Sequence, residues 1–441
     1  ESILTELKNL IPKPVLEFIR PPYHTALAVL AALVYRFPGR KLKVIGVTGT
    51  NGKSTTANFI AEVLEAGGYT VGLSTTVNFW TGDKKWLNET KMTSRGRFAM
   101  QKHLREMVKA GCTHAVIEVS SHALHWKRVW GIPFETAVFT NLTRDHLDLH
   151  GSMDAYRNEK GKLFAKLAKS PDGKTTAIVN GDDSDASYFL GFLADQKYVY
   201  GTADSVSEIL PLAHTVLAHD IKVNAAGSSF MALADGEEIP VTVHQPGRFN
   251  VSNALAAVSV GRAYEINPKA IADAIAKTPA IPGRMERVEA GQPFPIIVDY
   301  AHTPDAFDSV LSAVKEVTSG KVISVFGATG DRDRGKRPEL GKIAAKYSDY
   351  MFLTEEDPGT EDPHNIIEQV LPGISEAGKG HQDYEVQIKR RNAIKKALSM
   401  AKKGDTVILL GKGHETVMTY ADGKYPWDDR RVAAEEWEKV R

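Results

Sequence analysis

Short, nearly unbroken hydrophobic runs alternate along this chain with stretches whose apolar residues recur at helical spacing. In the N-terminal half such runs cover residues 43–49, 114–120, 136–142 and 176–182. Residues 53–66 follow the first run with a helical pattern. Strands that alternate with helices are typical of an α/β fold, so we predict a parallel sheet with helices on both faces.

Residues 197–245 break this pattern with short alternating runs, which predict a small antiparallel insertion. After the Pro-Gly pair at 282–283 a second α/β pattern begins, with apolar runs at 295–301, 321–327, 349–355 and 405–411. Pro and Gly punctuate domain boundaries as well as turns. We therefore expect a short helical segment over residues 1–40, a central parallel-sheet domain over residues 41–283 and a Rossmann-like α/β domain over residues 284–441.

The composition narrows the class of protein. Hydrophobic residues make up 42% of the chain and charged residues 25%, which is typical of a globular protein. Lys and Arg number 55 against 54 Asp and Glu, so the net charge of +1 favours neither a nucleic-acid partner nor a membrane surface. The longest apolar run, at 26–35, is too short to span a bilayer. The single cysteine, Cys112, permits no intrachain disulfide and fits a cytoplasmic location.

The stretch GVTGTNGKST, residues 46–55, is the strongest local motif. It lies between a predicted strand and a predicted helix, where glycines let backbone N–H groups approach a phosphate at the helix start. In such a loop Lys53 reaches the β- and γ-phosphates and Ser54 ligates Mg²⁺. The strict pattern places glycine at position 47, where this chain has valine and its glycine comes one residue early. We nevertheless predict nucleotide binding by a loop that comprises Gly49, Thr50, Asn51, Gly52, Lys53, Ser54 and Thr55.

The same loop resembles that of the Mur ligases and folylpolyglutamate synthetases, which use ATP to join an amino acid to a carboxylate. Further matching stretches follow in order: EVSSHAL (118–124), TNLTRDHLDLHG (140–151), DYAHTPDA (299–306), FGATGDRDRGKRPELG (326–341) and GKGHE (411–415). Together they are most similar to the MurE branch, which adds the third residue of the peptidoglycan stem peptide. The resemblance implies a central phosphate-loop ATPase domain, and a C-terminal domain that binds the incoming amino acid.

The resemblance also implies catalytic and metal-binding residues. Ser54 and Glu118 match the ligands of one Mg²⁺, and His146 matches a ligand of a second. Lys160 aligns with a carbamylated lysine whose new negative charge helps to bind that ion, although Lys162 nearby competes for the role. With Lys53 these residues form the predicted catalytic set, and ATP with two Mg²⁺ ions is the predicted cofactor set.

Other assignments carry over from the same motifs. On the nucleotide side the predicted contacts are Asn250, Asn253, Arg284, Asp299, Tyr300, His302 and Arg332, although Asn250 and Asn253 could equally cap a helix. The predicted substrate contacts are Thr93, Ser94, Ser120, Ser121, His122, Arg128, Lys336, Arg337, Asp357, Gly411 and Glu415.

The chain departs from the family pattern at the amino-acid site. Enzymes of the MurE branch that use meso-diaminopimelate carry Asp-Asn-Pro-Arg, whose arginine pairs with the free carboxylate of the incoming amino acid. Here Glu356-Asp357-Pro358-Gly359 stands in its place, so that fork of donors is lost. Glu356 and Asp357 add acid at this site, which favours a basic or small amino acid over meso-diaminopimelate. By resemblance, Glu415 in GKGHE matches the acidic residue that meets the amino group at the far end of the incoming side chain.

A second departure lies before the phosphate loop, where about 40 residues replace the larger UDP-binding domain of the family. Thr93-Ser94-Arg95 also replaces the expected Thr-Thr-Pro. We expect an amide-bond ligase for a muramoyl-dipeptide-like acceptor, a monomer whose partners are small molecules. The alternatives are a ligase for an acceptor without UDP (a pseudomurein-type peptide, or a folylpolyglutamate-type or other polymer) and a non-catalytic nucleotide-binding subunit.

Overall fold

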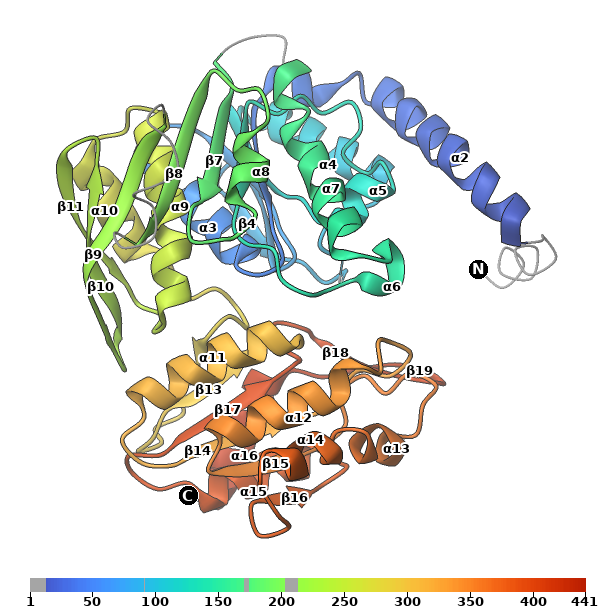
Figure 1. The fold of residues 1–441 in the computed structure, drawn as a ribbon, viewed down its shortest axis with the longest axis vertical. Helices are drawn as coiled ribbons and strands as arrows, with labels where there is room; N and C mark the ends of the chain where they lie inside the picture. The colour runs from blue at the N-terminus through green and yellow to red at the C-terminus, as the bar shows by residue number, and fades with distance from the viewer. Residues whose placement is uncertain (1–12, 91, 170–173, 203–212) are drawn as a thin grey trace.

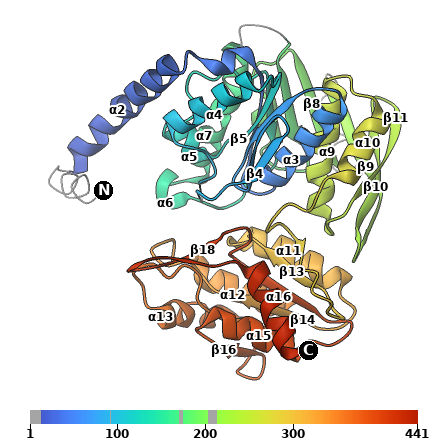
Figure 2. The same ribbon diagram turned by 180° about the vertical axis from the view of Figure 1, so that it is seen from behind.

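The computed structural model describes residues 13–90, 92–169, 174–202 and 213–441. They form two α/β bodies, one above the other in Figures 1 and 2, and a helix, α2 (Lys13–Val34), that projects from the upper body. The first twelve residues of the predicted helical segment, and residues 203–212 of the predicted antiparallel region, lie outside the described part of the chain. No helix within the described ranges has the length and apolar character to cross a membrane.

The upper body is built on an eleven-stranded sheet with the order β11-β10-β9-β8-β7-β6-β1-β5-β2-β3-β4. The strands from β8 to β2 in that order are parallel, and β1 lies between β5 and β6. Their bounds are β1 Lys43–Thr48, β2 Val71–Ser74, β3 Asn78–Thr81, β4 Lys84–Leu87, β5 His114–Glu118, β6 Thr136–Phe139, β7 Thr176–Asn180, β8 Gln196–Thr202, β9 His214–Asn224, β10 Gly227–Ala234 and β11 Glu237–Val243.

Helices cover both faces of this sheet, as the alternating pattern predicts. One face packs against α3 (Lys53–Ala66), α9 (Arg248–Ala263) and α10 (Pro268–Lys277). The other packs against α4 (Arg97–Lys109), α5 (Ser121–His125), α7 (Met153–Phe164) and α8 (Ala186–Leu190). The central strands are buried along their whole length, because they carry continuous Val, Ile and Ala runs with helices on either side.

The lower body is a six-stranded sheet with the order β12-β13-β17-β14-β15-β16, parallel except for the edge strand β12. Its strands are β12 Glu286–Arg287, β13 Ile296–Asp299, β14 Val322–Phe326, β15 Tyr350–Leu353, β16 Tyr384–Val386 and β17 Thr406–Leu410. One face carries α11 (Pro304–Val317), α12 (Lys336–Tyr347), α13 (Pro363–Glu368) and α14 (Leu371–Glu376), and the other carries α15 (Arg390–Met400) and α16 (Asp429–Val440). A hairpin, β18 (Val417–Tyr420) with β19 (Gly423–Pro426), stands apart.

The predicted α/β fold class is confirmed, with two refinements. The strands β9, β10 and β11 extend the main sheet. Strand β9 pairs in parallel with β8, and β10 then pairs antiparallel with β9 and β11. The hairpin strands β3 and β4 at the opposite edge and the short strand β16 were not predicted from the sequence. The predicted boundary at 282–283 falls in the connection between α10 and β12, and the three-part division of the chain remains a prediction.

Candidate active site

The predicted phosphate loop leaves the carboxyl end of β1 and enters α3 at Lys53. Its last residue, Gly52, has a φ of +80°, and a Cβ atom there would lie 2.2 Å from Asn253 Oδ1. Only glycine fits that left-handed, crowded position without strain. The segment after β6 holds the loop, because Thr50 N donates to Asn141 O over 2.8 Å and Asn51 N donates to Asn141 Oδ1 over 2.8 Å. The loop is therefore fixed in shape, and Asn141 is a structural contributor that sequence reasoning missed.

Ser54 and Glu118 meet behind the loop, although 64 residues separate them in the chain. Ser54 Oγ donates to Glu118 Oε2 over 2.7 Å, and Thr76 N donates to the same oxygen over 2.8 Å. Glu118 is buried at the end of β5, the strand beside β1. Parallel strands end at the same edge, so neighbouring strands deliver both side chains to one place.

Lys53 and Lys160 lie close to this pair. Lys160, on α7, is fully buried and its Nζ donates to Gly49 O over 2.6 Å. Burial holds the pKa of Lys160 well below its ordinary value, and the charge of Lys53 adds to the effect. Burial also lowers the pKa of Lys53, although Glu118 opposes that shift. Lys162, the rival of Lys160, is half exposed and pairs with Glu159 over 2.7 Å.

His146 lies in the segment after β6 and adopts a left-handed conformation with a φ of +54°. Desolvation lowers the pKa of His146 to about 4, which leaves the imidazole neutral at physiological pH. Burial would raise the pKa of the adjacent Asp145, but His146, His302 and Lys53 hold it below its ordinary value. A neutral imidazole is the form that can ligate a metal ion.

The donor set fits a magnesium ion. Ser54 and Glu118 offer a hydroxyl and a carboxylate oxygen at contact distance, and hard oxygen ligands are those that Mg²⁺ prefers. Both Lys160 and His146 lie against the Tyr156 ring, with Lys160 Nζ 4.2 Å and the His146 ring 6.2 Å from its centroid. The geometry thus brings together the four predicted metal-binding residues, and their role stays a prediction.

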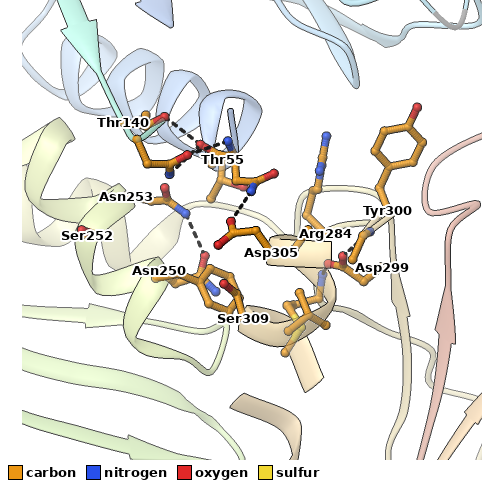
Figure 3. A pocket seen from close by; sticks show the side chains of 18 of the residues that line it. Thr55, Thr140, Asn250, Ser252, Asn253, Arg284, Asp299, Tyr300, Asp305 and Ser309 are labelled. Carbon is orange, nitrogen blue, oxygen red and sulfur yellow. Dashed lines mark hydrogen bonds between the residues drawn. The ribbon is translucent and has the colours of Figure 1, made fainter. Parts of the chain in front are cut away.

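A cavity of about 280 Å³ opens in front of the loop, between the two bodies. That volume lies near the lower end of the range of small-molecule sites, roughly 300 Å³. Figure 3 shows Asn250 and Asn253 on one side of it and Arg284, Asp299 and Tyr300 on the other. The predicted nucleotide contacts that line it are Asn51, Gly52, Thr55, Asn250, Asn253, Arg284, Asp299, Tyr300 and His302.

The two asparagines of α9 are tied to α3, the helix that follows the phosphate loop. Asn253 Nδ2 donates to Asn250 Oδ1 over 3.2 Å, and Thr56 Oγ1 donates to Asn253 Oδ1 over 3.2 Å. Asn250 Nδ2 in turn donates to Pro246 O over 3.1 Å, next to the helix start. Both side chains therefore have structural partners and also face the cavity, so the arrangement is compatible with the local structural role and with the predicted nucleotide contact.

The lower body supplies the other wall through the segment 299–305. Asp299 accepts from the N–H groups of Met285 and Ala301, each over 2.7 Å, and burial raises the pKa of its carboxyl group. Helix α11 begins within this segment, because Thr303 caps it and Pro304 occupies its first turn.

Asp305 joins the two bodies and was missed by the sequence analysis. Its Oδ2 accepts from Asn51 Nδ2 over 2.6 Å and from Thr143 Oγ1 over 3.2 Å, so it fastens α11 to the phosphate loop. It belongs to the quoted motif DYAHTPDA, which was the available signal. Arg144 and Glu339 add an exposed ion pair of 3.2 Å between the same bodies.

Three predicted cationic contacts, Arg332 for the nucleotide and Lys336 and Arg337 for the substrate, lie in different surroundings. Lys336 begins α12 and its Nζ donates to His302 O over 2.9 Å, at the cavity wall, whereas Arg332 is exposed and does not line the cavity. Arg337 is fully buried and binds Glu361 through both terminal nitrogens, over 2.9 and 3.0 Å. We therefore leave Arg337 out of the proposed substrate contacts and assign it a structural role.

The predicted acceptor-binding residues cluster around the start of α5. Arg128 Nη1 donates to Ser94 O over 3.0 Å, and Ser94 Oγ donates to Glu118 O over 3.2 Å, which links this group to the proposed metal ligand. Ser120 caps α5, and Ser121 Oγ lies 3.1 Å from His150 Nε2. The His122 ring lies 4.5 Å from that of His146, and Thr93 is partly buried.

At the proposed amino-acid site a lysine that the sequence analysis did not single out stands between the predicted acids. Lys412 is fully buried, and its Nζ contacts Asp357 Oδ1 at 2.8 Å and also Glu415 Oε2. Glu356 is buried as well, which raises its pKa, and it lies against Gly411 at the end of β17. Position 359, where the pattern of the diaminopimelate-using enzymes has arginine, has a φ of +60°, and a Cβ atom there would lie 2.2 Å from Asp331 Oδ2. The backbone is thus shaped for glycine at this position.

Comparisons with known proteins agree with this geometry. A family model described as the Mur ligase middle domain matches residues 47–261, and one described as Mur ligase, glutamate ligase domain matches residues 283–413. A UDP-N-acetylmuramyl-tripeptide synthetase of Roseiflexus sp. is 40% identical over 96% of this chain and 84% of its own. A UDP-N-acetylmuramoyl-L-alanyl-D-glutamate–2,6-diaminopimelate ligase of Bacillus cereus is 39% identical over 93% of this chain and 81% of its own.

One solved structure carries the same enzyme name as the Bacillus cereus relative. It is 32% identical, superposes with a TM-score of 0.60, and the match covers 90% of this chain and 78% of that one. The phosphate loop, the cavity between two α/β bodies and these matches lead to one conclusion. The chain belongs to the Mur ligase family of ADP-forming amide-bond ligases.

Proposed function

We propose that this ligase uses ATP to join a basic or small amino acid to the carboxylate of a muramoyl-dipeptide-like acceptor. A carboxylate oxygen of the acceptor attacks the γ-phosphorus of ATP, which forms an acyl phosphate and releases ADP. The amine of the amino acid then attacks the acyl carbon and loses a proton, and phosphate departs. The observation that carries the proposal is the hydrogen bond between Ser54 and Glu118 behind the phosphate loop. Asp305, from the second body, accepts a hydrogen bond from Asn51 of the same loop.

The first step brings a carboxylate against the phosphates of ATP, and the second step develops negative charge on the acyl oxygen and on the departing phosphate, so cations are needed beside these groups. Lys53 starts α3, where it can neutralise the transferred phosphoryl group beside the N–H groups of the helix start. Mg²⁺ held by Ser54 and Glu118, and a second Mg²⁺ held by His146 and Lys160, would neutralise the developing charge on the phosphoryl oxygens.

The burial of the Lys160 amine supports its carbamylation. Its lone pair can attack the carbon of CO₂, and loss of one N–H proton leaves a carbamate anion. Burial and the nearby Lys53 favour the uncharged amine, and Lys53 would then face an anion instead of a second cation. The enclosed position of Lys160, compared with the half-exposed Lys162, supports the choice between the two.

The preference for a basic or small amino acid rests on charge. Glu356, Asp357 and Glu415 contribute three carboxyl groups, and Lys412 contacts two of them. Glycine at position 359 leaves no guanidinium for the second carboxylate of meso-diaminopimelate. The Bacillus cereus relative is named for 2,6-diaminopimelate, so a comparison of amino acids is a stringent test of this preference.

An ADP-release assay with L-lysine, L-ornithine, L-alanine and meso-diaminopimelate tests the amino-acid preference. Higher kcat/KM for the first three supports it, and a meso-diaminopimelate preference refutes it. Glu415→Gln should lower kcat/KM for L-lysine more than for L-alanine, which serves as the matched control because its side chain carries no charge.

The acceptor needs its own experiment. Calorimetric titration of UDP-N-acetylmuramoyl-dipeptide, with a non-hydrolysable ATP analogue present, should give saturable binding. Arg128→Ala should weaken that binding, because the guanidinium lies with Ser94 beside the proposed acceptor site. Undetectable binding to the unaltered protein would remove this acceptor and favour one without UDP.

A further inference from the structure

A second group of potential metal ligands lies outside the proposed Mg²⁺ residues. His125 ends α5, His150 ends α6 (Leu147–His150), and Glu159 lies on α7. One ligand atom from each lies within 4.8 Å of the others, and within the described residues this is the one group of three or more His, Cys, Asp or Glu side chains with such spacing. The cluster of His125, His150 and Glu159 is called the α5–α7 cluster below.

The carboxyl group of Glu159 gives an independent indication of a ligand. Its side chain is 8% exposed, yet Oε1 is buried without a hydrogen-bond partner among the described residues. An unsatisfied carboxylate oxygen inside a protein costs free energy, and a bound cation removes that cost. The other oxygen, Oε2, contacts Lys162 Nζ at 2.7 Å and lies 3.6 Å from His125 Nδ1.

The spacing and chemistry fit a tetrahedral ion. Zinc bonds of about 2.0 Å to nitrogen and oxygen place tetrahedral ligand atoms roughly 3.3 Å apart. The observed 3.6 Å between His125 Nδ1 and Glu159 Oε2 is close to that value. Two imidazoles with one carboxylate suit Zn²⁺, Co²⁺ or Ni²⁺, whereas Mg²⁺ prefers oxygen ligands.

We propose that the α5–α7 cluster binds one transition-metal dication of the Zn²⁺ class, separate from the Mg²⁺ that accompanies ATP. Lys162 occupies this place as a counter-ion in the metal-free protein. Its side chain is 52% exposed, so it can leave Glu159 when the metal enters. The bound ion would join three segments that also carry Ser121 and His122, His146, and Lys160.

Calorimetric titration with ZnCl₂, in a large excess of Mg²⁺, tests the proposal on the full chain. We expect one Zn²⁺ per chain, and a Zn²⁺-soaked crystal should show an anomalous peak between α5 and α7. Loss of an outer hydrogen-bond partner of a metal site typically costs about 10–100-fold in affinity. His125→Ala and Glu159→Gln each remove a direct ligand or its charge, so each should cost at least ~10-fold.

Two further variants test whether Zn²⁺ binds at the α5–α7 cluster. Lys162→Met removes the competing cation and should tighten Zn²⁺ binding, which is the opposite sign. His364→Ala removes an exposed histidine of α13, remote from the cluster, and should leave the affinity unchanged. Circular dichroism and the metal-free melting temperature show whether each variant is folded.

Absence of stoichiometric Zn²⁺ binding would overturn the proposal. So would equal affinity in folded His125→Ala and Glu159→Gln, or an anomalous peak beside Ser54 and Glu118 instead. None of these readouts depends on ligase activity, so the metal site and the proposed function can fail separately.

Discussion

Replacement of Glu118 separates its structural role from its proposed role at the metal. Glu118→Ala removes the acceptor for Ser54 Oγ and for Thr76 N, which are bonded over 2.7 and 2.8 Å in a buried environment. Hydrogen bonds to a charged group contribute about 1.5–3 kcal/mol each, so the loss of both should cost ~3–6 kcal/mol of stability. Glu118→Gln keeps a side-chain oxygen for Thr76 N, and should cost less than half as much.

Activity should fall in both variants, because glutamine restores the shape of the Glu118 side chain but not its charge. Both variants should lose at least ~100-fold in ADP release, about 2.7 kcal/mol of transition-state stabilisation at ~1.36 kcal/mol per tenfold. Urea unfolding measures the stability change, and a coupled assay at saturating ATP and Mg²⁺ measures turnover. Near-normal turnover of Glu118→Gln would refute the metal role. An unaltered urea midpoint of Glu118→Ala would refute the structural reasoning.

Three further predictions rest on buried charge. Arg390 and Asp429 form a fully buried ion pair of 2.7 Å, so Asp429→Ala should cost ~3–5 kcal/mol in urea unfolding. Asp273→Ala breaks the exposed pair with Lys269 and should hardly change the urea midpoint. Equal costs of the two substitutions would contradict the argument. Burial lowers the pKa of His103 from 6.5 to about 4, so the unfolded chain binds a proton first as the pH falls, and up to ~3 kcal/mol of stability is lost between pH 6.5 and 4. The urea midpoint should fall less over that range for His103→Gln than for the unaltered protein. Parallel plots of midpoint against pH for the two proteins would exclude this cause. Removal of CO₂ should lower ADP release and added bicarbonate should restore it, whereas Lys160→Ala should be inactive in both conditions; indifference of the unaltered enzyme to CO₂ would argue against carbamylation.

The fold class was accessible from the sequence because its signals are local. The continuous apolar run of β1 and the glycine-rich turn before α3 lie within one short stretch, and the predicted helix over 53–66 has the observed bounds. The strand β4 was missed because its sequence, Lys-Lys-Trp-Leu, is largely polar and exposed at the sheet edge. Its partner strand, rather than its own residues, holds it in place.

Residues of the candidate site could be predicted from the sequence only where a motif indicates their role. Asp305 contacts Asn51 across 254 residues and Lys412 contacts Asp357 across 55, and neither separation has a local pattern. The cluster of cations in GDRDRGKRP gave no indication that Arg337 turns inward to Glu361 while Arg332 stays at the surface. Burial is a property of the packed chain, so only the structure could distinguish them.

The cavity owes its walls to two bodies that each have their own hydrophobic core. A nucleotide bound there would contact both bodies, and would therefore help to hold them together as well as react. If the bodies separate to exchange ADP for ATP, the short Asn51–Asp305 hydrogen bond would have to break. Each catalytic cycle would then include one mechanical opening, and a substitution at Asp305 would change the timing of product departure without touching the reacting atoms.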